Sequence, residues 1–142
     1  MSIPVTLSVE FRKLVEEQMD RTIHGIETTF FAIMEKQKFT PQEVKNEMEH
    51  LQEKFNVLFQ KWSLEILYTL LLKKISRFGE LKKVLGVNSR TLSDKLKLLQ
   101  AHGYIVRNVQ TTPPLCVDYT LSLKGKNAVL LALPLLYYST SV

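Results

Sequence analysis

The sequence predicts a mainly α-helical protein with a small β-hairpin, and three observations support this fold class. Apolar residues recur at steps of three and four through most of the chain, which is typical of amphipathic helices. One stretch, YIVRNV at 104–109, alternates instead, and the prolines of QTTPP separate it from a second extended stretch, LCVDYTLS. The third observation is the order of the expected elements. After an N-terminal helical hairpin come three helices, a β-hairpin and a last helix, and three helices followed by a β-hairpin are typical of the winged helix-turn-helix.

The first 60 residues predict two long helices and form the first expected domain. Ser8 can cap a helix whose apolar face runs over residues 11–33. Thr40 and Glu43 form a capping box at the start of the second helix, with a proline between them in the first turn. The apolar residues of this helix follow coiled-coil steps of 4 and 3 and are Val44, Met48, Leu51, Phe55 and Leu58. We expect this domain to mediate dimerisation.

Residues 61–142 form the second expected domain. KWSLEILYTLLLKK predicts an apolar helix with Ser63 as its cap and Trp62 as a core residue. Ser76 is expected to begin a short helix that Gly86 closes. The apolar residues of this short helix are Phe78, Leu81, Val84 and Leu85.

The remaining helices have their own start and stop signals. Asn88 or Ser89 begins the next helix, and Gly103 ends it. A final helix is expected from Leu123 to about residue 138, and Pro134 should kink or end it.

Charge is distributed unevenly along the chain. Residues 1–60 hold 7 Lys and Arg against 10 Asp and Glu, a balance of −3, whereas residues 61–142 hold 12 against 4, a balance of +8. This asymmetry favours contact between the C-terminal half and a polyanion. A solvated surface with an incidental bias accounts for the count equally well.

The expected helix at 89–102 has two different faces. At 100° per residue, Leu92, Leu96 and Leu99 fall on one side and can anchor the helix to a core. Arg90 and Lys97 point the opposite way. Arginine can contact guanine with two hydrogen bonds, and the free N–H groups of a first turn attract phosphate. An ordinary amphipathic helix has the same two faces, so the DNA-binding interpretation also depends on the hairpin and the charge.

The segment from KWSLEILYTLL to LLQAHGYIVRN resembles the core of the HxlR-type winged-helix transcriptional regulators. It has the Lys-Trp pair of that family, the Arg-Phe-x-Glu-Leu helix at 77–81, the Gly-Val turn at 86–87 and the leucine spacing of the next helix. The wing pattern Val-Glu-Tyr-x-Leu-Thr-x-x-Gly corresponds to VDYTLSLKG at 117–125, with Asp118 in place of Glu and Ser122 in place of Thr. The resemblance covers about residues 61–136. It implies a dimeric DNA-binding regulator with 88–97 as recognition segment and 110–115 as wing tip. MarR-like and archaeal Lrs-like regulators share this architecture.

Two features depart from the HxlR pattern. Some 60 residues precede the Lys-Trp pair, where the family usually has a short segment. Redox- and aldehyde-sensing members carry a cysteine ahead of the first core helix, and this chain has none there. Its one cysteine, Cys116, lies in the expected wing, where a buried and inert thiol is the simpler interpretation.

These arguments select two sets of residues. The residues expected to contact DNA are Arg77, Lys82, Asn88, Ser89, Arg90, Thr91, Ser93, Asp94, Lys95, Lys97, Arg107, Gln110, Thr111 and Thr112. The residues expected at a dimer interface are Met48, Leu51, Phe55, Leu58, Leu130, Leu133, Leu136 and Tyr137. Packing of the apolar C-terminal helix on the N-terminal hairpin of the same chain is the other interpretation, and the two are compatible.

Other kinds of site find no support in the sequence. His24, His50 and His102 lie far apart and follow no metal-ligand spacing, and one cysteine cannot form a multi-cysteine site. There is no Gly-rich phosphate loop and no nucleophile elbow. We therefore expect no catalytic activity, no metal and no cofactor.

The sequence also predicts a protein outside the membrane. Its longest apolar stretch, at 128–138, is far shorter than the roughly 20 residues of a membrane-spanning helix. The N-terminus lacks the basic start and apolar run of a signal peptide. A cytoplasmic location is expected.

Together these features predict a homodimeric regulator, acting as a repressor, that binds double-stranded DNA through a recognition helix and a wing. One alternative is a protein-interaction module on a winged-helix scaffold, docking through its acidic N-terminal hairpin. Another is a nucleoid-type protein that binds DNA without sequence preference. Arg90, Lys95 and Lys97 favour DNA over the interaction module, and the Asn-Ser-Arg of the first turn offers donors for base edges. The sequence indicates no particular small-molecule effector.

Overall fold

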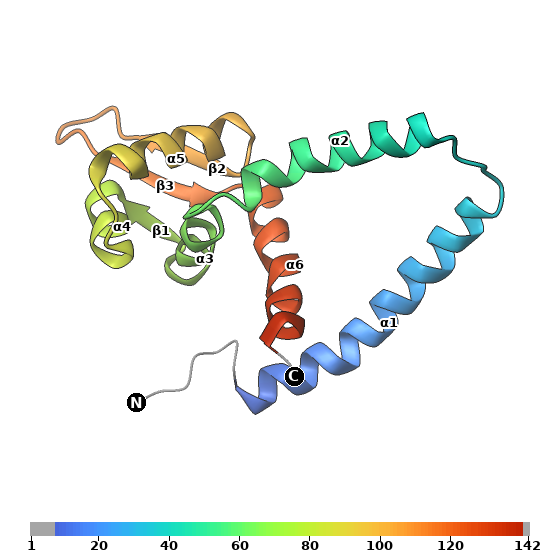
Figure 1. Ribbon diagram of the computed structural model, residues 1–142. Coiled ribbons are helices and arrows are strands. Elements are labelled where there is room, and N and C mark those ends of the chain that lie inside the picture. The colour runs from blue at the N-terminus through green and yellow to red at the C-terminus, as the bar shows by residue number, and fades with distance from the viewer. Residues whose placement is uncertain (1–7, 141–142) are drawn as a thin grey trace. The chain divides into compact units, whose positions relative to one another are not determined.

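The computed structural model describes residues 8–140 of the chain, which form six helices and three short strands (Figure 1). In chain order, the elements are α1 (Val9–Met34), α2 (Pro41–Leu58), α3 (Ser63–Lys73), β1 (Ile75–Arg77), α4 (Phe78–Leu85), α5 (Ser89–Ala101), β2 (Ile105–Val109), β3 (Val117–Leu121) and α6 (Leu123–Thr140). The mainly helical fold with a small β-structure that the sequence predicts is confirmed.

The two N-terminal helices begin where the sequence predicts them. The Ser8 side chain accepts a hydrogen bond from the Phe11 N–H (3.1 Å), and Thr40 Oγ1 accepts one from the Glu43 N–H (3.2 Å). Each bond satisfies one of the N–H groups that the first turn of a helix leaves without a partner.

The start of α3 differs from the prediction. Trp62, with φ of 78°, holds the N-cap position, and its N–H donates to Glu65 Oε2 (2.9 Å). Ser63 is the first helical residue and is fully buried, so it is not the cap that the sequence suggested. Trp62 is half-buried and packs against the core, as expected.

A three-stranded antiparallel sheet has the order β1-β3-β2. The hairpin of β2 and β3 was predicted, but β1 was not, because Ser76 was expected to begin a helix. Ser76 is instead a buried strand residue paired with Tyr119, whose other neighbour in the sheet is Arg107. Helix α4 therefore begins at Phe78. The apolar face of α4 is also narrower than predicted, because Val84 is 52% exposed.

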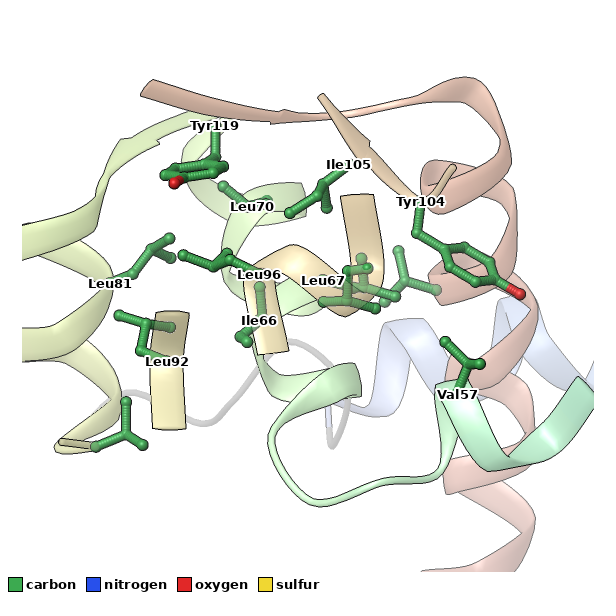
Figure 2. Close-up of a cluster of buried hydrophobic side chains, with 13 residues drawn as sticks. Val57, Ile66, Leu67, Leu70, Leu81, Leu92, Leu96, Tyr104, Ile105 and Tyr119 are labelled. Atoms are coloured by element: carbon green, nitrogen blue, oxygen red, sulfur yellow. The ribbon is translucent and has the colours of Figure 1, made fainter. Parts of the chain in front are cut away.

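The chain divides into two compact units, and the first to consider comprises residues 50–130. Its core takes side chains from the end of α2, from α3, α4, α5, β2 and β3, and from the start of α6. Figure 2 shows Leu96 of α5 among Leu81 of α4 and Ile66 and Leu67 of α3. At the end of α2, Val57 is buried against this core although it lies outside the predicted apolar face of that helix.

The second unit comprises residues 1–49 and 131–142, of which 8–49 and 131–140 are described. Val15 of α1 and Leu133 of α6 are buried, at 6% and 8% exposure. Most of the predicted apolar face of α1 is exposed, as shown by Ile23, Ile26, Phe30 and Ile33. The grouping by contacts does not test the predicted functional division between residues 60 and 61, which stays a prediction.

Helix α6 begins at Leu123 as predicted and continues through Pro134 to Thr140. Pro134 therefore does not end the helix. None of the helices within residues 8–140 is long and apolar enough to cross a membrane.

Truncating a core leucine should destabilise the protein strongly. Leu96 is 2% exposed, so Leu96→Ala should lower the free energy of unfolding by about 2–5 kcal/mol through lost burial and an unfilled cavity. Leu72→Ala is the matched control, because Leu72 is 60% exposed and its truncation should change stability by only about 0.5 kcal/mol. Urea unfolding of both variants measures the difference, and equal losses would contradict the assigned core.

Candidate nucleic-acid interface

The turn between α4 and α5 is set by three local features. Gly86 adopts a φ of 64°, where a side chain would be strained, and its N–H donates to the carbonyl of Lys82 (2.9 Å). Val87 is buried and anchors the turn to the core. Asn88 then caps α5, with its Oδ1 accepting from the Thr91 N–H (2.8 Å). The sequence therefore fixes where α5 starts and how its first turn is presented.

Helix α5 has the two faces expected from the sequence. Leu92, Leu96 and Leu99 are at most 2% exposed. Arg90 and Lys97 are exposed on the opposite side, together with Ser89 of the first turn and Asp94. The outward face is therefore cationic at two positions and contains one carboxylate.

Some of the predicted contact residues lie elsewhere on the helix. Lys95 is half-buried, and its Nζ donates to Gln60 Oε1 (2.6 Å) in the segment before α3. Its ammonium group therefore does not lie on the outward face. Thr91 and Ser93 are half-buried on the flanks. The Oδ1 of Asn88 accepts the cap hydrogen bond, and its amide nitrogen is the donor that it can offer a ligand.

A surface hollow of about 590 Å³ adjoins the first turn of α5. Its lining residues are Gly79, Lys82, Lys83, Gly86, Val87 and Asn88. Lys83 was not among the residues selected from the sequence, although the adjacent Lys82–Lys83 pair was the signal that could have identified it. Within residues 8–140, neither lysine of this pair forms an ion pair, and both side chains are exposed. Two ammonium groups and a helix N-terminus favour an anion at this place.

Arg77 lies just before α4, at the end of that helix opposite the α4–α5 turn. It is the last residue of β1 and the N-cap of α4, where its N–H donates to Glu80 Oε1 (3.3 Å). Because the backbone makes the cap, the exposed guanidinium group takes no part in that hydrogen bond.

The wing is the β2–β3 hairpin with its loop at 110–116. Asn108 Nδ2 donates to Asp118 Oδ1 (2.9 Å) and to Thr120 Oγ1 (3.2 Å), which ties the two strands together near the loop end of the hairpin. Beyond them, the Gln110 N–H closes the loop on the carbonyl of Cys116 (2.8 Å).

The side chains of the wing that were expected to meet DNA are accessible. Arg107 and Thr111 are exposed, and Gln110 Nε2 donates to Thr112 Oγ1 (3.4 Å) at the loop surface. Cys116 is half-buried just before β3, so the prediction of a buried thiol within a strand is wrong. Within residues 8–140, no group of three or more His, Cys, Asp or Glu side chains could hold a metal ion.

The residues expected at a dimer interface separate into three groups. Met48, Leu51, Phe55, Leu130 and Leu136 are exposed, at 37% to 51%. Leu58 is half-buried against the core, and Leu133 is 8% exposed, so contacts within the chain already cover these two side chains to different extents. The side chain of Tyr137 lies outside the described part of the structure.

Two packed helices, a cationic outward face on the second and an adjoining hairpin define a winged helix-turn-helix protein. The chain belongs to the HxlR-like helix-turn-helix family, whose model matches residues 57–136. The match takes in α3 to β3 and most of α6, whereas α1 lies outside it.

Curated relatives have names that agree with this family. The chain is 41% identical over 68 residues to the uncharacterized HTH-type transcriptional regulator YdzF of Bacillus subtilis, over 47% of this chain and 62% of YdzF. It is 33% identical over 72 residues to a second such protein of that species, YvaP, over 50% of this chain and 66% of YvaP. The chain thus spans just under two thirds of the length of these relatives.

Solved structures share the fold. The reduced form of the transcriptional regulator YodB of B. subtilis superposes with a TM-score of 0.55 at 20% identity, over 72% of this chain and 92% of that one. The redox regulator HypR in its reduced form gives a TM-score of 0.53 at 24% identity, over 63% and 86% of the two chains. At these identities the likeness concerns the fold alone.

The cap on α5 can be tested separately from any ligand. Asn88→Ala removes the acceptor for the Thr91 N–H and should lower the free energy of unfolding by about 0.5–2 kcal/mol. Asn88→Ser retains an acceptor and should stay close to the wild type. Thermal and urea unfolding provide the comparison, and equal stability of the Ala and Ser variants would show that the cap contributes nothing.

Proposed function

We propose that this protein is a dimeric transcriptional regulator that binds double-stranded DNA in a sequence-specific way and represses the genes it controls. In this proposal, α5 enters the major groove and the wing loop at 110–116 contacts the neighbouring backbone. A dimer bound over a promoter would exclude polymerase by its volume alone, which is why repression is the expected direction.

The observation that carries the proposal is the outward face of α5. Arg90 and Lys97 are exposed and, within the described residues, form no ion pair, while the opposite side of the helix is locked into the core. A helix held in this way can present donors to base edges without reorganising. Membership of a helix-turn-helix family supports the same conclusion.

The phosphate contacts are proposed for the residues around the α4–α5 turn. Lys82 and Lys83 line the hollow beside the first turn of α5, and Arg77 lies at the start of α4. Contacts of this kind set the register of a protein on the duplex, whereas base contacts select the sequence. Asp94 lies among the outward cations and would accept from a cytosine amino group.

Titration of a random pool of duplex DNA at two salt concentrations tests the function. Each neutralised phosphate should add about −0.9 to the slope of log affinity against log salt, so binding should weaken steeply. Selection from the same pool distinguishes the alternatives. A recovered motif supports a specific regulator, binding without a motif supports a nucleoid-type protein, and the absence of binding supports an interaction module.

Arg90 and Lys82 are expected to have different roles on DNA. Arg90→Ala should cost about 1–3 kcal/mol on the selected sequence and little on random DNA, because it removes a base contact. Lys82→Ala should weaken binding to both about equally, because it removes a phosphate contact. Competition titrations with specific and random duplexes measure both effects. The assignment of Arg90 to a base edge fails if the two variants show the same pattern.

The proposal of a dimer rests on exposed apolar side chains of α2 and α6. Met48, Leu51 and Phe55 lie on one side of α2 at steps of three and four and are 37–51% exposed. Leu130 and Leu136 of α6 are 42% and 46% exposed. Regularly spaced apolar residues that the chain itself leaves uncovered are typical of helices that pair with a second copy.

Charged substitutions on α2 test the dimer. The double variant Leu51→Glu, Phe55→Glu should give monomers that bind the selected operator weakly, because it places carboxylates in the proposed interface. Gln52→Glu, Asn56→Glu is the matched control, with the same charge change at neighbouring exposed positions of α2. Sedimentation measures the oligomeric state. A tight dimer in the first variant would exclude this interface.

A further inference from the structure

The start of α6 is bonded to the segment that leaves α5. Three consecutive carbonyl groups, those of His102, Gly103 and Tyr104, accept hydrogen bonds from the start of α6. Lys124 Nζ donates to the first of them (2.8 Å), and Ser122 donates through its Oγ to the second (2.6 Å) and through its N–H to the third (3.1 Å). All of these residues belong to the compact unit at 50–130.

The same residues are organised for this contact on both sides. Ser122 Oγ also accepts from the Gly125 N–H (3.0 Å) and so caps α6 with the oxygen that bonds to the α5 exit. Lys124 Nζ lies 4.4 Å from the centre of the Tyr104 ring, a cation–π distance. Gly103 has a φ of 78°, which turns the chain out of α5. The hydroxyl and N–H of Ser122 and the ammonium group of Lys124 thus join the end of α5 to the beginning of α6.

Gly125 makes the close approach possible. A Cβ at this position would lie 1.9 Å from the carbonyl oxygen of Tyr104, which is backbone and cannot move away as a flexible side chain would. Gly25 and Gly79, in contrast, have no atom within 4 Å of such a Cβ. Position 125 therefore requires glycine because a side chain would collide with the backbone at Tyr104, just after α5. The φ of Gly125 is one that other residues could adopt.

We infer that the first turn of α6 positions the recognition helix. Ser122, Lys124 and Gly125 fix the direction of α5 relative to α6, and two turns later α6 exposes Leu130, a proposed dimer residue. The inference rests on the proposed function, because in a dimer this direction sets the spacing between the two recognition helices. A dimer on DNA needs that spacing to match one helical turn, about 34–36 Å. Ser122, Lys124 and Gly125 are then determinants of the half-site spacing that the protein accepts.

The test compares duplexes with altered spacers. A palindromic operator selected by the wild-type protein is lengthened or shortened by one and by two base pairs, and a single half-site is the reference. For Lys124→Gln, the preference for the best spacer should fall by about two- to tenfold, the effect expected from the loss of one hydrogen bond. Affinity for the single half-site should not change.

The control is Lys126→Gln, which removes the same charge from the same turn of α6, where the side chain is exposed. It should retain the wild-type spacing preference. Gly125→Ala should broaden the preference further, and if it does not fold, Lys124→Gln still decides the outcome. The inference is overturned if Lys124→Gln weakens all spacers in proportion or leaves the preference intact.

A second measurement separates this inference from the proposed function. In the free protein, hydrogen exchange at the Ser122 amide, which donates to Tyr104, should be faster in Lys124→Gln than in Lys126→Gln. If the wild-type protein binds no DNA, the proposed function fails while exchange still reports on the contact. If exchange is faster and the spacing preference is unchanged, the contact exists but does not position α5, and the inference is wrong.

Discussion

Burial of one face of α5 is the constraint on which the rest of the structure depends. Leu92, Leu96 and Leu99 fill the centre of the core, and a buried leucine contributes roughly 1.5–3 kcal/mol. Because side chains follow one another at 100° around a helix, this burial determines which residues face outward. Arg90 and Lys97 are therefore exposed because the leucines on the other face are buried. No contact of the two cationic side chains themselves is required to hold them outward.

The two ends of α5 have different surroundings. At its N-terminus, the cap uses one oxygen of Asn88, and the hollow beside it is lined by Lys82 and Lys83, so this end is accessible and electropositive. At its C-terminus, the carbonyl groups that leave the helix accept hydrogen bonds from Ser122 and Lys124. The N-terminal end is thus the proposed site for an anion, and the C-terminal end is hydrogen-bonded to the start of α6.

Local chemistry explains which elements could be predicted from the sequence. The caps at Ser8, Thr40 and Asn88 and the turn at Gly103 depend on neighbouring residues, and all four occur where expected. Strand β1 was missed because it has three residues and pairs with β3, so Ser76 lies opposite a residue more than 40 positions later. No local pattern reports such a pairing.

The candidate site was predicted in outline for the same reason. The leucine spacing identified the outward face of α5, but the sequence could not show that Lys95 reaches Gln60 or that Lys83 lines a hollow. The Lys95–Gln60 contact joins segments 35 residues apart, which meet only in the fold. The hollow at Lys83 is lined by residues 79–88 alone, but its shape depends on how the α4–α5 turn folds. The uneven charge along the chain could be read from the sequence, but the position of each lysine side chain could only be read from the structure.

The N-terminal extension has a row of exposed apolar side chains on α1. Helix α1 lies outside the region that matches the family and exposes Ile26, Phe30 and Ile33 at 53–63%. Single exposed apolar residues are ordinary, but a regular row of them along one helix is typical of an interaction surface. Residues 1–60 carry a charge balance of −3, against +8 for residues 61–142, which makes nucleic acid an unfavourable partner for this part of the chain. These features support the proposal that the extension contacts protein, while the basic half of the chain contacts the polyanion.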